Sequence, residues 1–266
     1  MLDRIIAAEY VAAVGNGRTK PLHLVCDKAD GSTVEVIAKF SANCEEGVIN
    51  LARETIAACL AADLGLPIPV PYLVEIPPDF PDIVPDVSRR DKIKASAQFA
   101  FGSTFVTGQY SAWVTGGKIS EALVPTAAAV FAFDAIVGNP DRRDTNPNCL
   151  VKGDELRIFD HELCFMDALM LPFLRPPPPW KLGGVKPFET PGNHIFRAGL
   201  RGRPLDFTDV RSRWKGLSDA RLMAYEGSIP TEWAAAGQAV KASLNLVRDA
   251  RDNIDGCIAE IQRVLT

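Results

Sequence analysis

Three side chains able to act as metal ligands or as acid–base groups surround a predicted hairpin in residues 138–162, GNPDRRDTNPNCLVKGDELRIFDHE. They are Asp141, Asn146 and Asp160. The apolar runs NCLV and ELRIF predict two short strands, and the KGD sequence between them is typical of a tight turn. A turn tip at Gly153-Asp154 sets a register that places Asn146 within about one residue of the position opposite Asp160.

An amide and a carboxylate that converge at the open end of a hairpin supply the hard oxygen ligands that Mg²⁺ prefers. Asp141, in the preceding loop, is placed to orient or deprotonate a hydroxyl nucleophile. Arg142 can pair with a nearby carboxylate or phosphate. Each residue alone also fits a turn or a backbone cap. The joint pattern favours a site for phosphoryl transfer, where catalysis consists mainly of positioning and charge neutralisation.

Composition limits the classes of protein to consider. The 266 residues are 47% hydrophobic, with a net charge of −4, enough for a sizeable core in one large domain or two small lobes. The mild acidity argues against wholesale nucleic-acid binding. No apolar run is long enough to span a bilayer, and the N-terminus lacks signal-peptide features. Six cysteines without a C-x-x-C pair indicate reduced thiols. We therefore expect a cytoplasmic protein without direct nucleic-acid contacts.

The first 75 residues read as strands followed by one helix. EYVAAV, LHLVC and TVEVIAKF have strand patterns, and Lys39 lies at the end of the third. A helical period at 46–64 ends at Gly65. The proline- and charge-rich stretch 77–98 predicts a long loop or lobe connector. A strand pattern resumes near 99–108.

Helices dominate the remainder. Pro125 and Gly138 bracket a predicted helix at 126–137. Residues 167–204 have no clear period, which a compact protein tolerates only in a functional or mobile segment. PTEW at 230–233 predicts a helix start, and the 4-3-4 spacing of isoleucines and leucine at 254–265 predicts an amphipathic helix.

This combination resembles one family. N-x-D-R-x-x-x-N, a short hairpin and a hydrophobic-x-D-H ending resemble the catalytic and metal-binding segments of the HipA-like kinases and, more distantly, of phosphatidylinositol kinases. GRTKPLHLVC…VEVIAKF resembles that family's glycine-containing loop and the strand bearing the ATP lysine. NLARETIAACLAADLGLPIPVPYLVEI resembles the family's next helix and the Gly-Leu-Pro-x-Pro segment that follows this helix. The resemblance spans roughly residues 8–165, and IPTEW fits more weakly.

The resemblance implies specific roles. Lys39 would contact the α- and β-phosphates of ATP and pair with Glu54, since an unpaired ammonium in the cleft would be costly. Asp141 would accept or orient the substrate hydroxyl, and Asn146 and Asp160 would bind Mg²⁺. The phosphates would be approached by the backbone of Gly15 and Gly17, with Arg18 or Thr19 nearby.

Two features depart from kinase relatives. Arg143 stands where many relatives carry His. The metal motif is Asp160-His161-Glu162, without the glycine of Asp-Phe-Gly, which suggests a less mobile metal loop. The glycine loop has no obvious serine for self-inactivation, so inhibitory autophosphorylation is not carried over.

The resemblance implies an α+β, two-lobe, protein-kinase-like fold with a β-rich N-lobe that contains one helix, and a mainly helical C-lobe. We expect the nucleotide-binding N-lobe at 1–108, including the connector, and the C-lobe with catalytic loop and metal hairpin at 109–266. The implied reaction moves the γ-phosphoryl group of ATP to a hydroxyl, first of all protein Ser/Thr.

Other functions stay open. The acceptor hydroxyl could belong to a lipid or small molecule. The chain could instead be a pseudokinase-like module that binds nucleotide or a protein without turnover, or an enzyme that transfers AMP. The presence of Lys39, Glu54, Asp141, Asn146 and Asp160 together argues against the module. Toxin-like biology and an antitoxin-like protein partner follow from the family resemblance alone.

Overall fold

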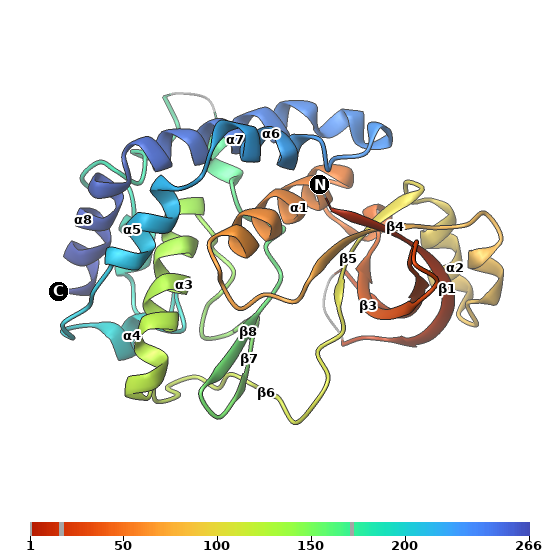
Figure 1. Ribbon diagram of the computed structural model, residues 1–266, viewed down its shortest axis with the longest axis horizontal. Helices are drawn as coiled ribbons and strands as arrows, with labels where there is room; N and C mark the ends of the chain where they lie inside the picture. The colour runs from red at the N-terminus through yellow and green to blue at the C-terminus, as the bar shows by residue number, and fades with distance from the viewer. Residues whose placement is uncertain (1, 16–18, 171–172) are drawn as a thin grey trace.

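The computed structural model describes residues 2–15, 19–170 and 173–266. Its N-terminal part is a closed barrel of five strands in the order β1-β2-β3-β5-β4 (Figure 1). The strands are β1 (Asp3–Ala13), β2 (Leu22–Asp27), β3 (Thr33–Lys39), β4 (Pro71–Glu75) and β5 (Phe99–Thr104). The antiparallel pairs are completed by a parallel pair between β1 and β4, which closes the barrel. The predicted strands are therefore confirmed, and β1 begins earlier than its pattern suggested.

Lys39 is the last residue of β3, paired with Phe101 of β5. Val36 and Ala38, three residues and one residue before it, are fully buried in the barrel core. Because successive strand side chains point to opposite faces, Lys39 leaves the barrel core and faces the rest of the protein.

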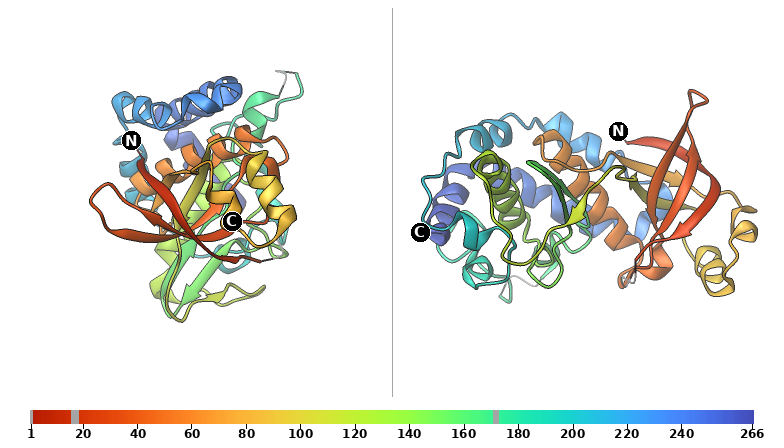
Figure 2. Two further views of the ribbon diagram at one scale, coloured as in Figure 1. Left: turned by 90° about the vertical axis from the view of Figure 1, so that its right-hand side faces the viewer. Right: turned by 90° about the horizontal axis from the view of Figure 1, so that it is seen from below.

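The predicted helix at 46–64 is α1 (Val48–Asp63), and Gly65 follows it in the left-handed conformation. Glu54 and most of its other side chains are buried, because α1 lies between the barrel and the helices α6 (Asp219–Glu226) and α7 (Gly237–Asp252) (Figures 1 and 2). The stretch 77–98 is not a continuous loop, because it contains α2 (Val87–Lys94). The Asp86 carboxylate caps this helix by accepting from the Arg89 N–H.

The C-terminal part is mainly helical. It consists of α3 (Val124–Val137), α4 (Arg197–Leu200), α5 (Thr208–Lys215), α6, α7 and α8 (Ile254–Leu265), with a 3₁₀ turn at Thr231–Ala236. Gly138 ends α3 with φ of 65°, as its sequence position predicted. Apart from residues 171–172, which are not described, the segment 167–204 contains only short helical turns and α4. No helix in the described residues is long and apolar enough to cross a membrane.

The predicted hairpin is formed by β7 (Cys149–Lys152) and β8 (Glu155–Ile158), which join the two-residue strand β6 (Ser111–Ala112) in a small sheet. Cys149 pairs with Ile158 and Lys152 with Glu155, so the tip is Gly153-Asp154 and the register is the one predicted.

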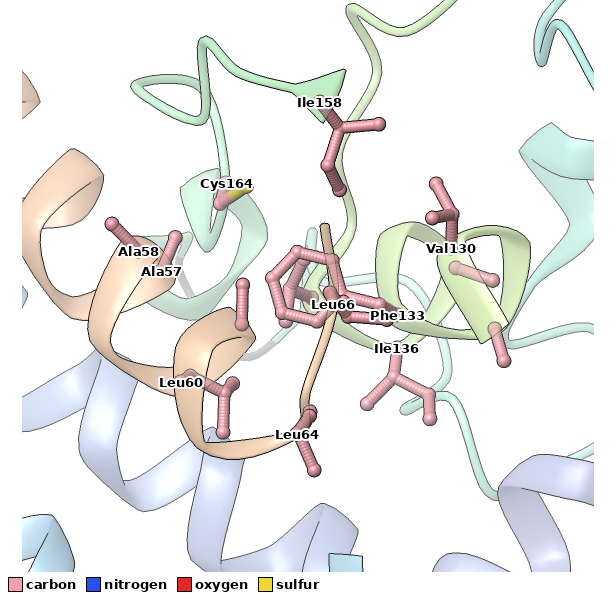
Figure 3. Packing of buried hydrophobic residues seen from close by; sticks show 14 of the residues in the cluster. Ala57, Ala58, Leu60, Leu64, Leu66, Val130, Phe133, Ile136, Ile158 and Cys164 are labelled. Atoms are coloured by element: carbon pink, nitrogen blue, oxygen red, sulfur yellow. The ribbon is translucent and has the colours of Figure 1, made fainter. Parts of the chain in front are cut away.

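One apolar cluster fixes the relative positions of the elements that carry the polar residues. Figure 3 shows Leu60 of α1, Phe133 of α3, Ile158 of β8 and Leu66 of the α1 exit packed together. All four side chains are buried. Such a core is close-packed, so α1, α3 and the hairpin hold the side chains they carry in one arrangement.

Candidate active site

Lys39 contacts three carboxylates at once. Its Nζ lies 2.6 Å from Asp160 Oδ1, 3.0 Å from Glu54 Oε2 and 3.4 Å from Glu162 Oε2. The Lys39 side chain is only 10% exposed and that of Glu54 3%. The predicted Lys39–Glu54 ion pair is therefore present, and Asp160 joins it from a position 121 residues away in the chain.

Burial and ion pairing oppose each other in this cluster. Burial lowers the pKa of Lys39, but attraction to Asp160, Glu54 and Glu162 outweighs it and raises that pKa well above its ordinary value. Burial likewise raises the pKa of Glu54, yet Lys39 and His161 bring it down to about 2. For Glu162 burial prevails, helped by repulsion from Asp160 and Glu54, and its pKa is raised.

The donor set fits a divalent cation. Oxygen atoms of Glu54, Asp160 and Glu162 lie within 4.8 Å of one another. The three carboxylates carry two more negative charges than Lys39 balances. A divalent cation would neutralise this excess. Carboxylate oxygens are hard ligands suited to Mg²⁺.

Asp141 lies at the turn after α3 and has a side chain that is 17% exposed. Its Oδ2 accepts from Asn146 Nδ2 at 2.8 Å and from Asn148 Nδ2 at 3.2 Å. These two amides hold the carboxylate in one orientation. Among the hydrogen bonds of the described residues, none joins Asn146 to Asp160, so their joint role as metal ligands stays a prediction. The Asn146 amide oxygen is its remaining acceptor for a ligand.

The buried Asp134 of α3 organises the loop that carries Asp141. Its Oδ1 accepts from Asn139 Nδ2 at 2.8 Å, and its Oδ2 accepts from Arg142 Nε at 2.7 Å and from His194 Nε2 at 3.0 Å. Burial raises its pKa, but Arg142 and His194 keep the net shift downward, so Asp134 remains ionised. Arg142 therefore pairs with a carboxylate in the core, rather than with phosphate.

Arg142 also connects the hairpin to the loop. Its Nη1 donates to the carbonyl oxygens of Asn148 and Phe159, which lie at the base of β7 and after β8. Its Nη2 lies 3.0 Å from His161 Nε2. Because a guanidinium only donates, Nε2 of His161 accepts, and the ring proton is on Nδ1, which faces Glu54.

Two buried histidines, His161 and His194, have structural positions here. The His161 N–H donates to Glu54 Oε2 at 2.8 Å, so the backbone of His161 ties the loop after β8 to α1. His194 is buried. It accepts at Nδ1 from the Phe196 N–H, so Nε2 donates to Asp134. Burial is the main reason that the pKa of His194 is lowered.

The glycine-containing loop is described only at its edges. Gly15 has φ of 63°, a conformation that favours glycine, and Thr19 is buried. Gly17 and Arg18 lie outside the described residues. The phosphate role of this loop therefore stays a prediction.

The sequence matches the HipA-like kinase family over residues 8–173, more than half of the chain. The chain belongs to the HipA-like kinase family. The matched region contains Lys39, Glu54, Asp141, Asn146 and Asp160.

A solved structure resembles this HipA-like kinase over nearly its whole length. It is the Helicobacter pylori proinflammatory kinase CtkA, which is 13% identical, with a TM-score of 0.48, covering 98% of this chain and 99% of its own. No curated protein matches the sequence.

Three residues of this HipA-like kinase that contact the candidate site were missed from sequence. Asp134 was the only charged residue in an apolar helix, which is a usable signal for a buried polar contact. Asn148 follows Asn146 in the sequence N-P-N. Spacing alone does not predict that both amides donate to Asp141. Glu162 was read only as part of the metal motif. Its position two residues after Asp160 could have suggested a second carboxylate on the same cation.

Proposed function

We propose that this HipA-like kinase uses ATP and Mg²⁺ to phosphorylate a hydroxyl group, with protein Ser or Thr as the first acceptor. The observation that carries the proposal is the convergence of Lys39, Glu54 and Asp160 from three distant segments. Their side chains join β3, α1 and the residues after β8. A charged lysine and a surplus of carboxylates at one place suit a metal-bound nucleotide.

Each side chain has a role in the proposed reaction. Lys39, kept protonated by its carboxylate partners, holds phosphate oxygens of ATP. Glu54 keeps Lys39 in place. Asp160 and Asn146, with Glu162 beside them, would hold Mg²⁺, which would neutralise negative charge on the phosphates. These residues supply binding and charge, which dominate phosphoryl transfer.

Asp141 acts on the acceptor. Its carboxylate, held by Asn146 and Asn148, orients the acceptor hydroxyl and takes its proton. The hydroxyl oxygen forms a bond to the γ-phosphorus while the bond from that phosphorus to the bridging oxygen of ADP breaks. The products are a phosphate ester, ADP and the proton on Asp141.

The fold supports a two-lobe arrangement of this site. We assign residues 1–108 to a nucleotide-binding lobe and 109–266 to a helical lobe with the catalytic loop and hairpin. The barrel carries Lys39, and the helical part carries Asp141 and Asp160. Helix α1 belongs to the first lobe by sequence but packs in the core of the second.

One experiment tests the proposal. Purified protein is incubated with Mg²⁺ and ATP labelled at either the γ- or the α-phosphate, with a mixture of protein acceptors. The same assay is run on Asp141→Ala, Asp160→Ala and the control Asp154→Ala, whose side chain lies at the exposed hairpin tip and accepts from Ser120. We expect γ-label on acceptor protein with wild type and Asp154→Ala, and none with the other two variants.

The remaining outcomes contradict specific parts of the proposal. Transfer of α-label indicates that AMP moves instead of a phosphoryl group. Nucleotide binding without transfer of either label indicates a binding module. Equal activity of Asp141→Ala and wild type shows that the assigned site is wrong.

A further inference from the structure

A cavity with several charged residues in its walls lies beside the candidate catalytic loop. Its volume is about 460 Å³, and its walls come from the loop 115–119, the segment 191–199, Asp144 and Arg203. Asp144 is three residues beyond Asp141, so the cavity shares one wall with the loop that carries the proposed base.

Three hydrogen bonds fix this cavity to the catalytic loop. The Asp144 N–H donates to the Gly192 carbonyl at 3.0 Å, and the Ile195 N–H donates to the Arg142 carbonyl at 3.2 Å. On the other wall, Thr115 Oγ1 donates to the Asp144 carbonyl at 2.9 Å. A ligand in the cavity therefore has a defined position relative to the loop.

The charges that line the cavity are mainly positive. Lys118, Arg197 and Arg203 oppose the single carboxylate of Asp144. Arg203 is engaged, because it pairs with Glu121 and donates to the Ile119 carbonyl. Within the part of the chain that the structure describes, Lys118 and Arg197 have neither a carboxylate partner nor a side-chain hydrogen bond.

The Arg197 side chain has a donor nitrogen without a hydrogen-bond acceptor. Its Nε is buried and has no hydrogen-bond partner. Buried polar donors are nearly always paired in folded proteins, since leaving one unpaired is costly. A guanidinium without an acceptor from its own chain suits a carboxylate or phosphate, which can accept hydrogen bonds from it.

We propose that this cavity binds an acidic side chain of the protein acceptor, at a fixed offset from the hydroxyl that Asp141 addresses. The proposal rests on the proposed function and names its substrate class: a Ser or Thr accompanied by a carboxylate or a phosphate. Arg197 forms the direct contact inside the cavity. Lys118, exposed at the rim, attracts the same charge.

Peptide phosphorylation tests this assignment. Ser/Thr peptides carry Glu, phosphoserine, Ala or Lys at one fixed position at a time, and kcat/KM is measured for each. Wild type is expected to prefer Glu or phosphoserine over Ala at one offset by about tenfold or more, the range of one charge-assisted hydrogen bond. The comparison of Glu with phosphoserine distinguishes the two anions.

Variants connect the preference to the cavity. Arg197→Gln and Lys118→Gln should each reduce the preference, with Ala peptides phosphorylated as by wild type. Arg201→Gln is the matched control, because Arg201 follows α4 but contacts the Thr266 carbonyl outside the cavity. No preference for an acidic residue, or a preference unchanged in both Arg197→Gln and Lys118→Gln, overturns the proposal.

A second measurement separates this proposal from the proposed function. Fluorescence anisotropy follows binding of the same acidic and neutral peptide pools without any phosphoryl transfer. Acidic binding that falls in Arg197→Gln but not in Arg201→Gln supports the cavity even if no variant transfers label. Equal binding of acidic and neutral pools by wild type refutes it, even if the kinase is active.

Discussion

Replacing Lys39 by Met removes the cation that pairs with three carboxylates. In the wild type the pKa of Glu54 lies at about 2 instead of 4.5, despite its burial, because of Lys39 and His161. A pKa lowered by that amount corresponds to about 3 kcal/mol of favourable interaction. Breaking a buried pair from one side typically costs ~3–5 kcal/mol. We expect the free energy of unfolding of Lys39→Met to fall by about 3 kcal/mol at neutral pH.

The contribution of Glu54 to the free energy of unfolding should change with pH in opposite directions in the wild type and in Lys39→Met. The wild-type contribution of Glu54 is fully present above its unfolded pKa of about 4.5 and is lost as the pH falls towards 2. Without Lys39, burial raises the pKa of Glu54, so the folded variant binds a proton more tightly than the unfolded chain. The variant then becomes more stable as the pH falls from neutral. The difference between its free energy of unfolding and that of the wild type therefore becomes smaller.

Urea denaturation at neutral pH and at about pH 5, with and without MgCl₂, measures these differences. Mg²⁺ should stabilise Lys39→Met more than wild type, because it replaces the missing positive charge. Lys94→Met is the control, because Lys94 pairs with Asp82 on the surface at 2.9 Å, where solvent screens the pair and its contribution to stability is small. The reasoning is refuted if both variants lose the same stability, or if the Lys39→Met deficit is unchanged at the lower pH.

Two further predictions concern the elements that position the site. Asp134→Asn should cost about 3 kcal/mol in urea denaturation, because it leaves the fully buried Arg142 without its carboxylate, and a loss below about 1 kcal/mol would contradict the role given to Asp134. Gly138→Ala should cost only about 1 kcal/mol in the same measurement, because Gly138 has φ of 65° and open space where the new methyl group would lie; a loss above about 3 kcal/mol would indicate a steric conflict instead.

The hairpin was predictable to the residue because local chemistry determines it. Gly153-Asp154 fixes the tip, and the tip fixes every pair in β7 and β8. The helix α3 was equally predictable, because Pro125 is typical of a helix start and Gly138 of a helix end. The Lys39–Glu54 pair, in contrast, came from family resemblance, because spacing along the chain does not bring β3 and α1 together.

Contacts that depend on tertiary structure were not predictable. Glu162 and Asp160 reach Lys39 only because the end of the hairpin meets the end of β3. His194 reaches Asp134 across 60 residues of sequence, from a segment without a period. Helix α2 was missed because prolines and charges dominate its surroundings, although Asp86 is a residue type that favours the N-cap position of a helix.

The position of α1 decides which parts of this protein can move against each other. Because α1 packs mainly with α6 and α7, Glu54 is anchored among the helices, as are Asp160 and Glu162 on the segment after β8, whereas Lys39 ends a barrel strand. All three ion pairs of Lys39 therefore cross the junction between the barrel and the helices. The lysine that would bind nucleotide therefore also stabilises the contact between the barrel and the helices, and separating the two would require its three ion pairs to break.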